Sequence, residues 1–111
     1  MDQKSLDRNI DAYFDAITTR TADAIGAVFE HAAVLEHPGG RCDGRDEIVA
    51  FYKENNLIHE HFSVDESQRL YGLVSASVQL VLHLDDIATN VGAFFNFSDD
   101  NRIQRLAIYT R

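Results

Sequence analysis

The segment Ala32-Ala-Val-Leu-Glu-His-Pro-Gly-Gly40, with Gly44-Arg-Asp-Glu-Ile-Val-Ala-Phe-Tyr52 shortly after it, carries most of the structural information in this chain. The apolar run that opens the first segment is too short for a helix and is typical of a strand, which the Pro38-Gly39-Gly40 turn ends. The strand therefore closes on an ionisable residue, His37, that directly precedes a proline.

Three helices are predicted around this strand, because apolar residues recur there at helical spacing. The first helix has its apolar stripe at Leu6, Ile10, Tyr13, Phe14 and Ile17. The second is short, follows the N-cap Thr21 and carries Ile25, Val28 and Phe29. The third begins near Gly44 with Asp43 as its N-cap, carries Ile48, Phe51 and Tyr52, and ends at Asn55-Asn56.

The second half of the chain changes from helical spacing to alternation, which is typical of strands with one buried face. The inward sets are Phe62 and Val64, then Val78, Leu80, Leu82 and Leu84, then Thr89, Val91, Ala93, Phe95 and Phe97, with a last strand over 102–109. Hairpin turns are expected at Asp85-Asp86 and over 98–101. Helices followed by such a meander predict one α+β domain spanning 1–111, with a curved sheet wrapped over the helices.

The composition disfavours two classes of partner, nucleic acids and anionic membranes. Eighteen acidic residues against ten basic ones give a formal charge of −8, which disfavours binding to nucleic acid and to anionic membranes. No segment is apolar enough to cross a bilayer, and the single cysteine, Cys42, forms no internal disulfide, so a cytoplasmic location is expected. Asp7, Asp11 and Asp15 are expected to form a solvated face of the first helix.

The chain resembles the SnoaL-like, nuclear transport factor 2-like superfamily. The pattern that carries the resemblance is Tyr13, then Phe29 with Ala33-Val-Leu-Glu-His-Pro38, then Gly44-Arg-Asp-Glu-Ile48 and Phe51-Tyr52. The resemblance covers nearly the whole chain and implies a cone-shaped, curved antiparallel or mixed sheet packed on three N-terminal helices. It implies less about activity, because this fold hosts isomerases, dehydratases, cyclases, epoxide hydrolases and non-catalytic adaptors.

The interval from Tyr13 to Pro38 is most similar to the bacterial ketosteroid isomerases. That resemblance implies that Tyr13 donates to an enolate oxygen, with Tyr52 supporting it. His37 stands where those enzymes have an aspartate base, and Ala93 stands where they have a protonated acid. A methyl group cannot donate, and losing one such donor costs about 100-fold to 1,000-fold in rate, so steroid isomerisation itself is not expected.

His37 is expected to act as a base in its own right, since an imidazole has an ordinary pKa of about 6.5. The imidazolium that it forms could also stabilise a developing oxyanion and partly cover for Ala93. Dehydratases of the same fold use histidine in the cavity, which makes a lyase the rival reaction. The expected catalytic residues are therefore His37, Tyr13 and Tyr52, in an isomerase or lyase that needs no cofactor.

The ligand is expected to be a small hydrophobic or weakly polar organic molecule. The hollow that holds it is predicted to be lined by Phe51, Val91, Ala93, Phe95 and Phe97, although such a stripe is also typical of a core. The alternative is a ligand-binding or assembly module without chemistry, which the alanine at position 93 favours.

Two further features stay open at this stage. His59-Glu60-His61 places two imidazoles on one face of a strand, which suits a two-point metal chelate, but no motif designates His37 or His83 as the third ligand. No metal site is therefore predicted. The resemblance also implies a homodimer, and the outward residues Ser75, Ser77, Gln79, Val81 and His83 are mixed enough to form its face.

Overall fold

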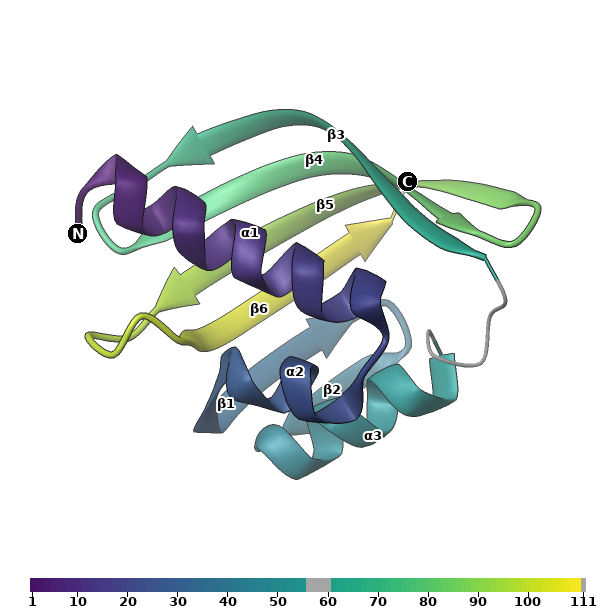
Figure 1. Cartoon of the computed structure of the whole chain (residues 1–111), viewed down its shortest axis with the longest axis horizontal. Helices are drawn as coiled ribbons and strands as arrows, with labels where there is room; N and C mark the ends of the chain where they lie inside the picture. Colours follow the sequence, from purple (N-terminus) through teal and green to yellow (C-terminus); the bar gives the residue numbers. More distant parts are fainter. Residues whose placement is uncertain (56–60, 111) are drawn as a thin grey trace.

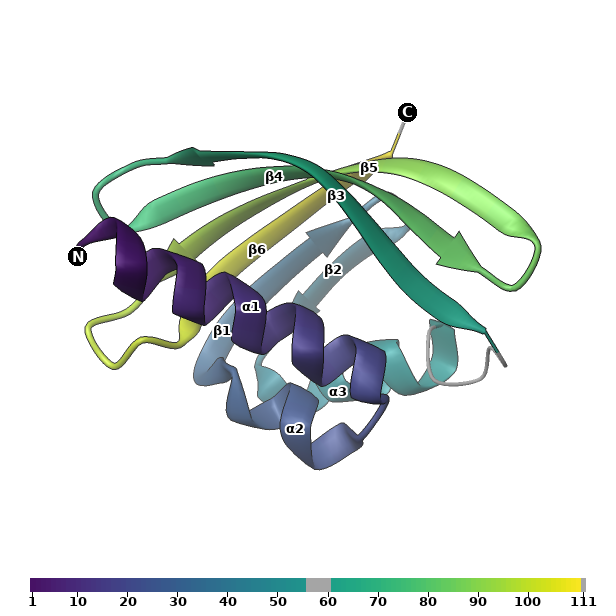
Figure 2. The ribbon, with the colours of Figure 1, turned by 45° about the horizontal axis from the view of Figure 1, so that its top comes forward.

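In the computed structural model, which describes residues 1–55 and 61–110, one curved sheet arches over three helices (Figures 1 and 2). The elements are, in order, α1 (Gln3–Thr19), α2 (Ala22–Ala27), β1 (Phe29–His37), β2 (Gly40–Asp43), α3 (Arg45–Asn55), β3 (Phe62–Tyr71), β4 (Ser75–Leu84), β5 (Ile87–Phe97) and β6 (Ile103–Thr110). The predicted α+β cone is confirmed. None of the helices in the described part of the chain is long and apolar enough to span a membrane.

The sheet has six strands in the order β2-β1-β6-β5-β4-β3. Strands β3 to β6 form the predicted antiparallel meander, and β1 joins it by pairing in parallel with β6. The register shifts between Phe29 and Val34, between Glu66 and Gln68, and between Asn96 and Phe97. Because an extra residue bends its strand and increases local twist, these irregularities help to curl the sheet over the helices.

Two local predictions are wrong. Helix α2 ends at Ala27, and Phe29 opens β1 instead of continuing the helix, because the Val28 carbonyl accepts the Ile103 N–H at 2.8 Å and Phe29 pairs with that residue. Asp43 does not cap α3 with its side chain. It ends the unpredicted strand β2, and its carboxylate accepts the Arg41 Nε–H at 2.8 Å. In both places pairing in the sheet overrides a local helical preference.

The core lies between the concave face of the sheet and α1. The predicted stripe of α1, which comprises Leu6, Ile10, Tyr13, Phe14 and Ile17, is buried as expected. The alternation of β5 is confirmed as well, since Val91, Ala93, Phe95 and Phe97 are buried and their neighbours are more exposed. These two faces fix α1 across the sheet.

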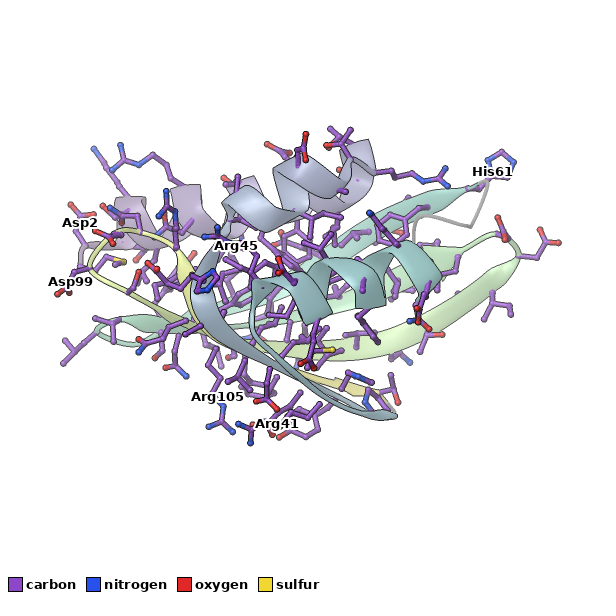
Figure 3. The ribbon with its side chains drawn as sticks, turned by 90° about the horizontal axis from the view of Figure 1, so that it is seen from below. Asp2, Arg41, Arg45, His61, Asp99 and Arg105 are labelled. Carbon is purple, nitrogen blue, oxygen red and sulfur yellow. The ribbon has the colours of Figure 1, made fainter. Side chains whose placement is uncertain are left out.

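Arg45 connects the start of α3 to the start of β1. Its Nε and Nη2 groups both donate to the Phe29 carbonyl, at 3.1 and 2.7 Å. Figure 3 shows Arg45 among the packed elements, whereas Arg41 and Arg105 project outward from the sheet. Arg45 therefore satisfies the Phe29 carbonyl at the helix-to-strand junction, which explains the long basic side chain directly after Gly44.

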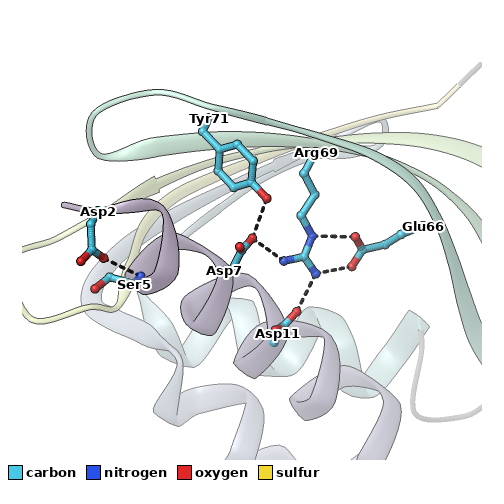
Figure 4. A network of polar contacts seen from close by, with 7 residues as sticks. All are labelled: Asp2, Ser5, Asp7, Asp11, Glu66, Arg69 and Tyr71. Carbon is cyan, nitrogen blue, oxygen red and sulfur yellow. Dashed lines mark hydrogen bonds and ion pairs between the residues drawn. The ribbon is translucent and has the colours of Figure 1, made fainter.

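Arg69 ties β3 to α1 through three carboxylates (Figure 4). Its guanidinium binds Glu66 through two contacts of 2.7 Å, Asp7 at 2.9 Å and Asp11 at 2.6 Å. Tyr71 adds an O–H donor to Asp7 at 2.6 Å, and this bond together with Arg69 lowers the pKa of the Asp7 carboxyl. Asp7 and Asp11 are therefore not simply solvated, because they hold the edge strand of the sheet against α1.

The substitution Arg69→Met is expected to lower the free energy of unfolding by about 1–2 kcal/mol, because it leaves three carboxylates close together without their cation. Chemical denaturation measures the change. The matched control is Arg105→Met, whose partner Glu36 lies on the outer surface, and its effect should stay below about 1 kcal/mol. Equal losses in the two variants would show that the Arg69 network contributes no more than an ordinary surface ion pair.

Candidate functional site

A cavity of about 640 Å³ lies between the concave face of the sheet and the helices α1 and α3. It contains both groups that the sequence proposes for chemistry, a pair of phenols and an imidazole. Its described lining residues are Tyr13, Phe14, Ile17, His37, Pro38, Gly39, Phe51, Tyr52, Glu54, Asn55, Phe62, Leu80, Leu82, Leu84, Thr89, Val91, Ala93, Ile108 and Thr110. The wall is mostly hydrocarbon, and its polar groups are few.

The cavity exists because the sheet extends further than the helix that covers it. Along β4, Leu80 is buried, but Leu82 and Leu84, which point the same way, are only half-buried. The early part of β5 repeats this, since inward-facing Thr89 is less buried than Val91. Helix α1 ends at Thr19, so the last inward residues of the hairpin face a space instead of a helix.

Tyr13 of α1 and Tyr52 of α3 meet in this cavity with their hydroxyl oxygens 2.5 Å apart. Both side chains are almost fully buried, at 3% and 2% exposed. The Tyr13 ring is held edge-on by Phe14 and Phe95, each with its centroid 5.2 Å away. The aromatic packing fixes the phenol, and the hydroxyl pair satisfies the only polar atom that each ring buries.

Burial raises the pKa of both phenols, and the neighbouring hydroxyl raises the pKa of Tyr52 further. Both rings are therefore neutral near pH 7 and act as hydrogen-bond groups, not as bases. The pair holds two protons, of which one lies between the two oxygens. Among the described residues neither hydroxyl has another hydrogen-bond partner, so the pair uses one of its two protons internally.

His37 enters the cavity from the end of β1. Its ring stacks on Phe51 of α3, with centroids 4.2 Å apart and planes inclined by 30°. The Gly39 N–H donates to Nδ1 at 3.1 Å, across the turn that leads to β2. The strand end, the stacking partner and the turn together orient an imidazole whose ring shares a wall with Tyr13 and Tyr52.

The structure separates the predicted pocket residues into two groups. Phe51, Val91 and Ala93 line the cavity beside the three predicted catalytic residues. Phe95 and Phe97 do not line it, and their expected place in the pocket is corrected: they lie deeper in the core, stacked with centroids 5.7 Å apart. They share a face with Val91, but α1 covers that end of β5, so the alternation alone could not separate pocket from core.

Several lining residues were not singled out from the sequence. Glu54 and Asn55 follow Phe51 on α3, and the Asn55 side chain donates to the Phe51 carbonyl at 2.8 Å. Glu54 is the only carboxylate among the described lining residues. Helical spacing from Phe51 could have identified Glu54, and the alternation of β4 and β5 could have added Leu82 and Thr89.

The proposed histidine chelate cannot be assessed as a pair, because His59 lies outside the described residues. His61 is exposed at the far end of the sheet and points away from the protein (Figure 3). His83 instead contacts Asp65 at 2.9 Å. Over 1–55 and 61–110, no group of three or more histidine, cysteine or acidic side chains is arranged to hold a metal ion.

Residues 10–106 match the family of SnoaL-like domains. A search of curated protein sequences finds no significant match. Among solved structures, the chain is similar to a SnoaL-like protein of unknown function from Burkholderia thailandensis, with a TM-score of 0.87, 16% identity, and coverage of 100% of this chain and 98% of that one.

Two further solved structures have functional names. One is a proposed polyketide cyclase from Sinorhizobium meliloti, with a TM-score of 0.82, 23% identity, and coverage of 95% of this chain and 98% of the other. The second is a proposed ketosteroid isomerase from Kribbella flavida, with a TM-score of 0.81, 19% identity, and coverage of 97% and 78%. At these identities the similarity establishes the fold.

The buried phenols predict a loss of stability in alkali. Folding raises the pKa of Tyr13 and Tyr52 above the ordinary value of about 10. The free energy of unfolding therefore keeps its full value below about pH 10. Above that pH it falls by up to about 1.4 kcal/mol per pH unit for each phenol. Denaturation of the wild type and of the Tyr13→Phe, Tyr52→Phe double variant between pH 8 and 11 measures this. The double variant removes both hydroxyls together and should show a shallower decline. An identical decline in both proteins would contradict the assignment.

Proposed function

This chain belongs to the SnoaL-like domain family, and on that basis we propose that it is an isomerase or lyase that binds a small, uncharged or weakly polar organic molecule. The observation that carries the proposal is the shared cavity: two neutral phenols and one imidazole line the same mostly apolar space of about 640 Å³. That volume suits a small organic ligand. The chemistry of these groups is proton transfer next to a polarised oxygen, which requires no cofactor.

Tyr13 is proposed to polarise the oxygen of the ligand, and Tyr52 is proposed to donate a hydrogen bond to Tyr13. When Tyr52 donates to Tyr13, the Tyr13 proton is left free to bind an oxygen in the cavity. A neutral phenol in a site from which water is excluded stabilises developing negative charge more effectively than it would in water. The raised pKa of Tyr13 keeps that proton on the phenol until it is needed.

His37 is proposed to exchange the proton. It shares the cavity wall with the tyrosine pair, and stacking on Phe51 limits the orientations of its ring. An imidazole changes charge near neutral pH, so it can give or take a proton without the large pKa shift that a carboxylate would need. The two structural neighbours named after an isomerase and a cyclase are compatible with this type of reaction.

A binding protein without chemistry is the second candidate, and Ala93 favours it. Ala93 lines the cavity where ketosteroid isomerases carry a second donor, and its methyl group supplies no hydrogen bond. In this alternative the same cavity holds a ligand, and the tyrosine pair only recognises its oxygen.

The proposed chemistry can be tested with 3-cyclohexen-1-one, a simple ketone whose isomerisation to the conjugated form is followed by ultraviolet absorbance. His37→Ala is expected to lower the rate by about 100-fold or more, and Tyr13→Phe by about 100-fold to 1,000-fold. His83→Ala is the control, because His83 pairs with Asp65 and does not line the cavity. Binding of the ketone without turnover would support the second candidate, and full activity in His37→Ala would exclude His37 from the reaction.

We further propose that two copies of the chain pair through the outer face of the sheet. A hollow of about 540 Å³ lies on that face, and Ser77, Gln79 and Val81 of the predicted dimer face line it. Leu70, Phe94 and Tyr109 also border it and are 58%, 49% and 57% exposed. None of the described residues lining the hollow is charged, so two chains of net charge −8 could meet there without placing like charges in contact.

Sedimentation velocity tests the pairing. The wild type is expected to sediment as a dimer, and Phe94→Glu is expected to sediment as a monomer because it would bury two carboxylates in the interface. Leu73→Glu is the matched control, since Leu73 is 86% exposed and lies outside the hollow. A monomeric wild type, or a Phe94→Glu variant that still pairs, would rule out this face.

A further inference from the structure

We infer that the main chain holds neutral His37 as its Nε2–H tautomer, so that His37 meets the ligand as a hydrogen-bond donor. The ligand must then present an acceptor, such as a carbonyl oxygen, to this residue. The inference rests on the proposed function, because it concerns the same cavity. It revises both the role expected from the sequence and the proton exchange proposed above, because the resting neutral imidazole then offers the ligand a proton at Nε2 instead of a lone pair.

The hydrogen bond from Gly39 determines the tautomer. A backbone N–H can only donate, so Nδ1, which lies 3.1 Å from the Gly39 nitrogen, must carry a lone pair and no proton. A neutral imidazole has one proton on its two nitrogens, and that proton is therefore on Nε2. Turning the ring over would place Cδ2 at the Gly39 N–H and lose the bond.

The turn sequence explains why this bond forms. His37 and Gly40 face each other across the β1–β2 hairpin, and Pro38-Gly39 forms its loop. A polar side chain at the first position of a turn often accepts from the N–H two residues later, and Nδ1 does so here. A Cβ atom on Gly39 would lie 3.4 Å from both Nδ1 and Cε1, so the loop backbone lies directly against that edge of the ring.

The other nitrogen is left for the ligand. His37 lines the cavity, and Nε2 makes no hydrogen bond to any described residue. Acting as a base from the neutral state would require the proton to move to Nδ1, where it would face the Gly39 N–H. The tyrosine pair has one spare O–H as well. His37 and the tyrosine pair thus both offer donors, and a ligand with acceptor oxygens satisfies them.

Nitrogen-15 NMR of histidine-labelled protein tests the tautomer directly, with the His37 signals identified by their loss in His37→Gln. In the neutral form, Nδ1 is expected at the chemical shift of an unprotonated ring nitrogen and Nε2 at that of a protonated one. Gly39→Ala keeps the N–H donor and should keep this pattern, whereas Gly39→Pro removes the donor and should shift the populations toward Nδ1–H. A protonated Nδ1 in the wild type would overturn the inference, and so would identical populations in a folded Gly39→Pro variant.

A matched pair of ligands tests the consequence for recognition. The probes are 2-acetylnaphthalene, which carries an acceptor oxygen, and 2-isopropylnaphthalene, which has a similar shape without one. His37→Phe keeps a ring to stack on Phe51 and removes Nε2, and His37→Gln places an amide N–H near the same position. We expect His37→Phe to weaken binding of the ketone by about 2-fold to 13-fold and to leave the hydrocarbon unchanged, with Gln restoring part of the loss.

The experiments distinguish failure of the proposed function from failure of the donor role of His37. If neither probe binds the wild type in the cavity, the proposed function fails, while the NMR result still stands or falls separately. If both probes bind and His37→Phe affects them equally, the donor role fails and the cavity remains a ligand site.

Discussion

The contact on which the site depends is the hydrogen bond between the hydroxyls of Tyr13 and Tyr52. Both side chains are almost fully buried, and a buried hydroxyl without a partner is strongly unfavourable, so each phenol satisfies the other. The two residues are 39 positions apart and come from different helices, α1 and α3. Their bond joins a side chain of α1 to one of α3 at the cavity wall, and it uses only one of the two hydroxyl protons.

The cavity forms because the sheet is longer than the helix α1 that covers it. Strand β4 continues past the end of α1 and β5 begins beyond it, so the inward residues nearest the β4–β5 turn have no helix to pack against. The curvature of the sheet keeps this uncovered part concave, and α3 with the β1–β2 turn forms the remaining wall. The closed end of the cone is filled by Phe95 and Phe97, and the Arg69 network holds the edge strand against α1. Rigid packing at one end thus supports an open, mostly apolar space at the other.

Much of the fold follows from periodicity in the chain. The buried stripe of α1 and the inward set of β5 are both correct, because in each element one face must leave water and the spacing of apolar residues records which face. The local sequence pattern predicts the wrong element where pairing with another strand determines the structure. Phe29 joins β1 because β6 pairs with it, and the β2 strand forms because β1 offers an edge to Cys42. Strand β6 is more than 70 residues from Phe29, so no local pattern contains that pairing, whereas β2 follows β1 directly across the Pro38-Gly39 loop and is short enough to be missed.

The same division holds for the site. The sequence alone determined which groups are available, a pair of tyrosines and a histidine before a Pro-Gly-Gly turn, and the resemblance to SnoaL-like proteins placed them on one concave face. Only the tertiary structure decided that Phe95 belongs to the core while Ala93 lines the cavity, because the rings of Tyr13 and Phe14 pack on Phe95. Only the structure placed the Gly39 N–H against Nδ1 of His37. Residue types fix what a site can do, whereas distance and orientation in three dimensions fix which nitrogen is free to do it.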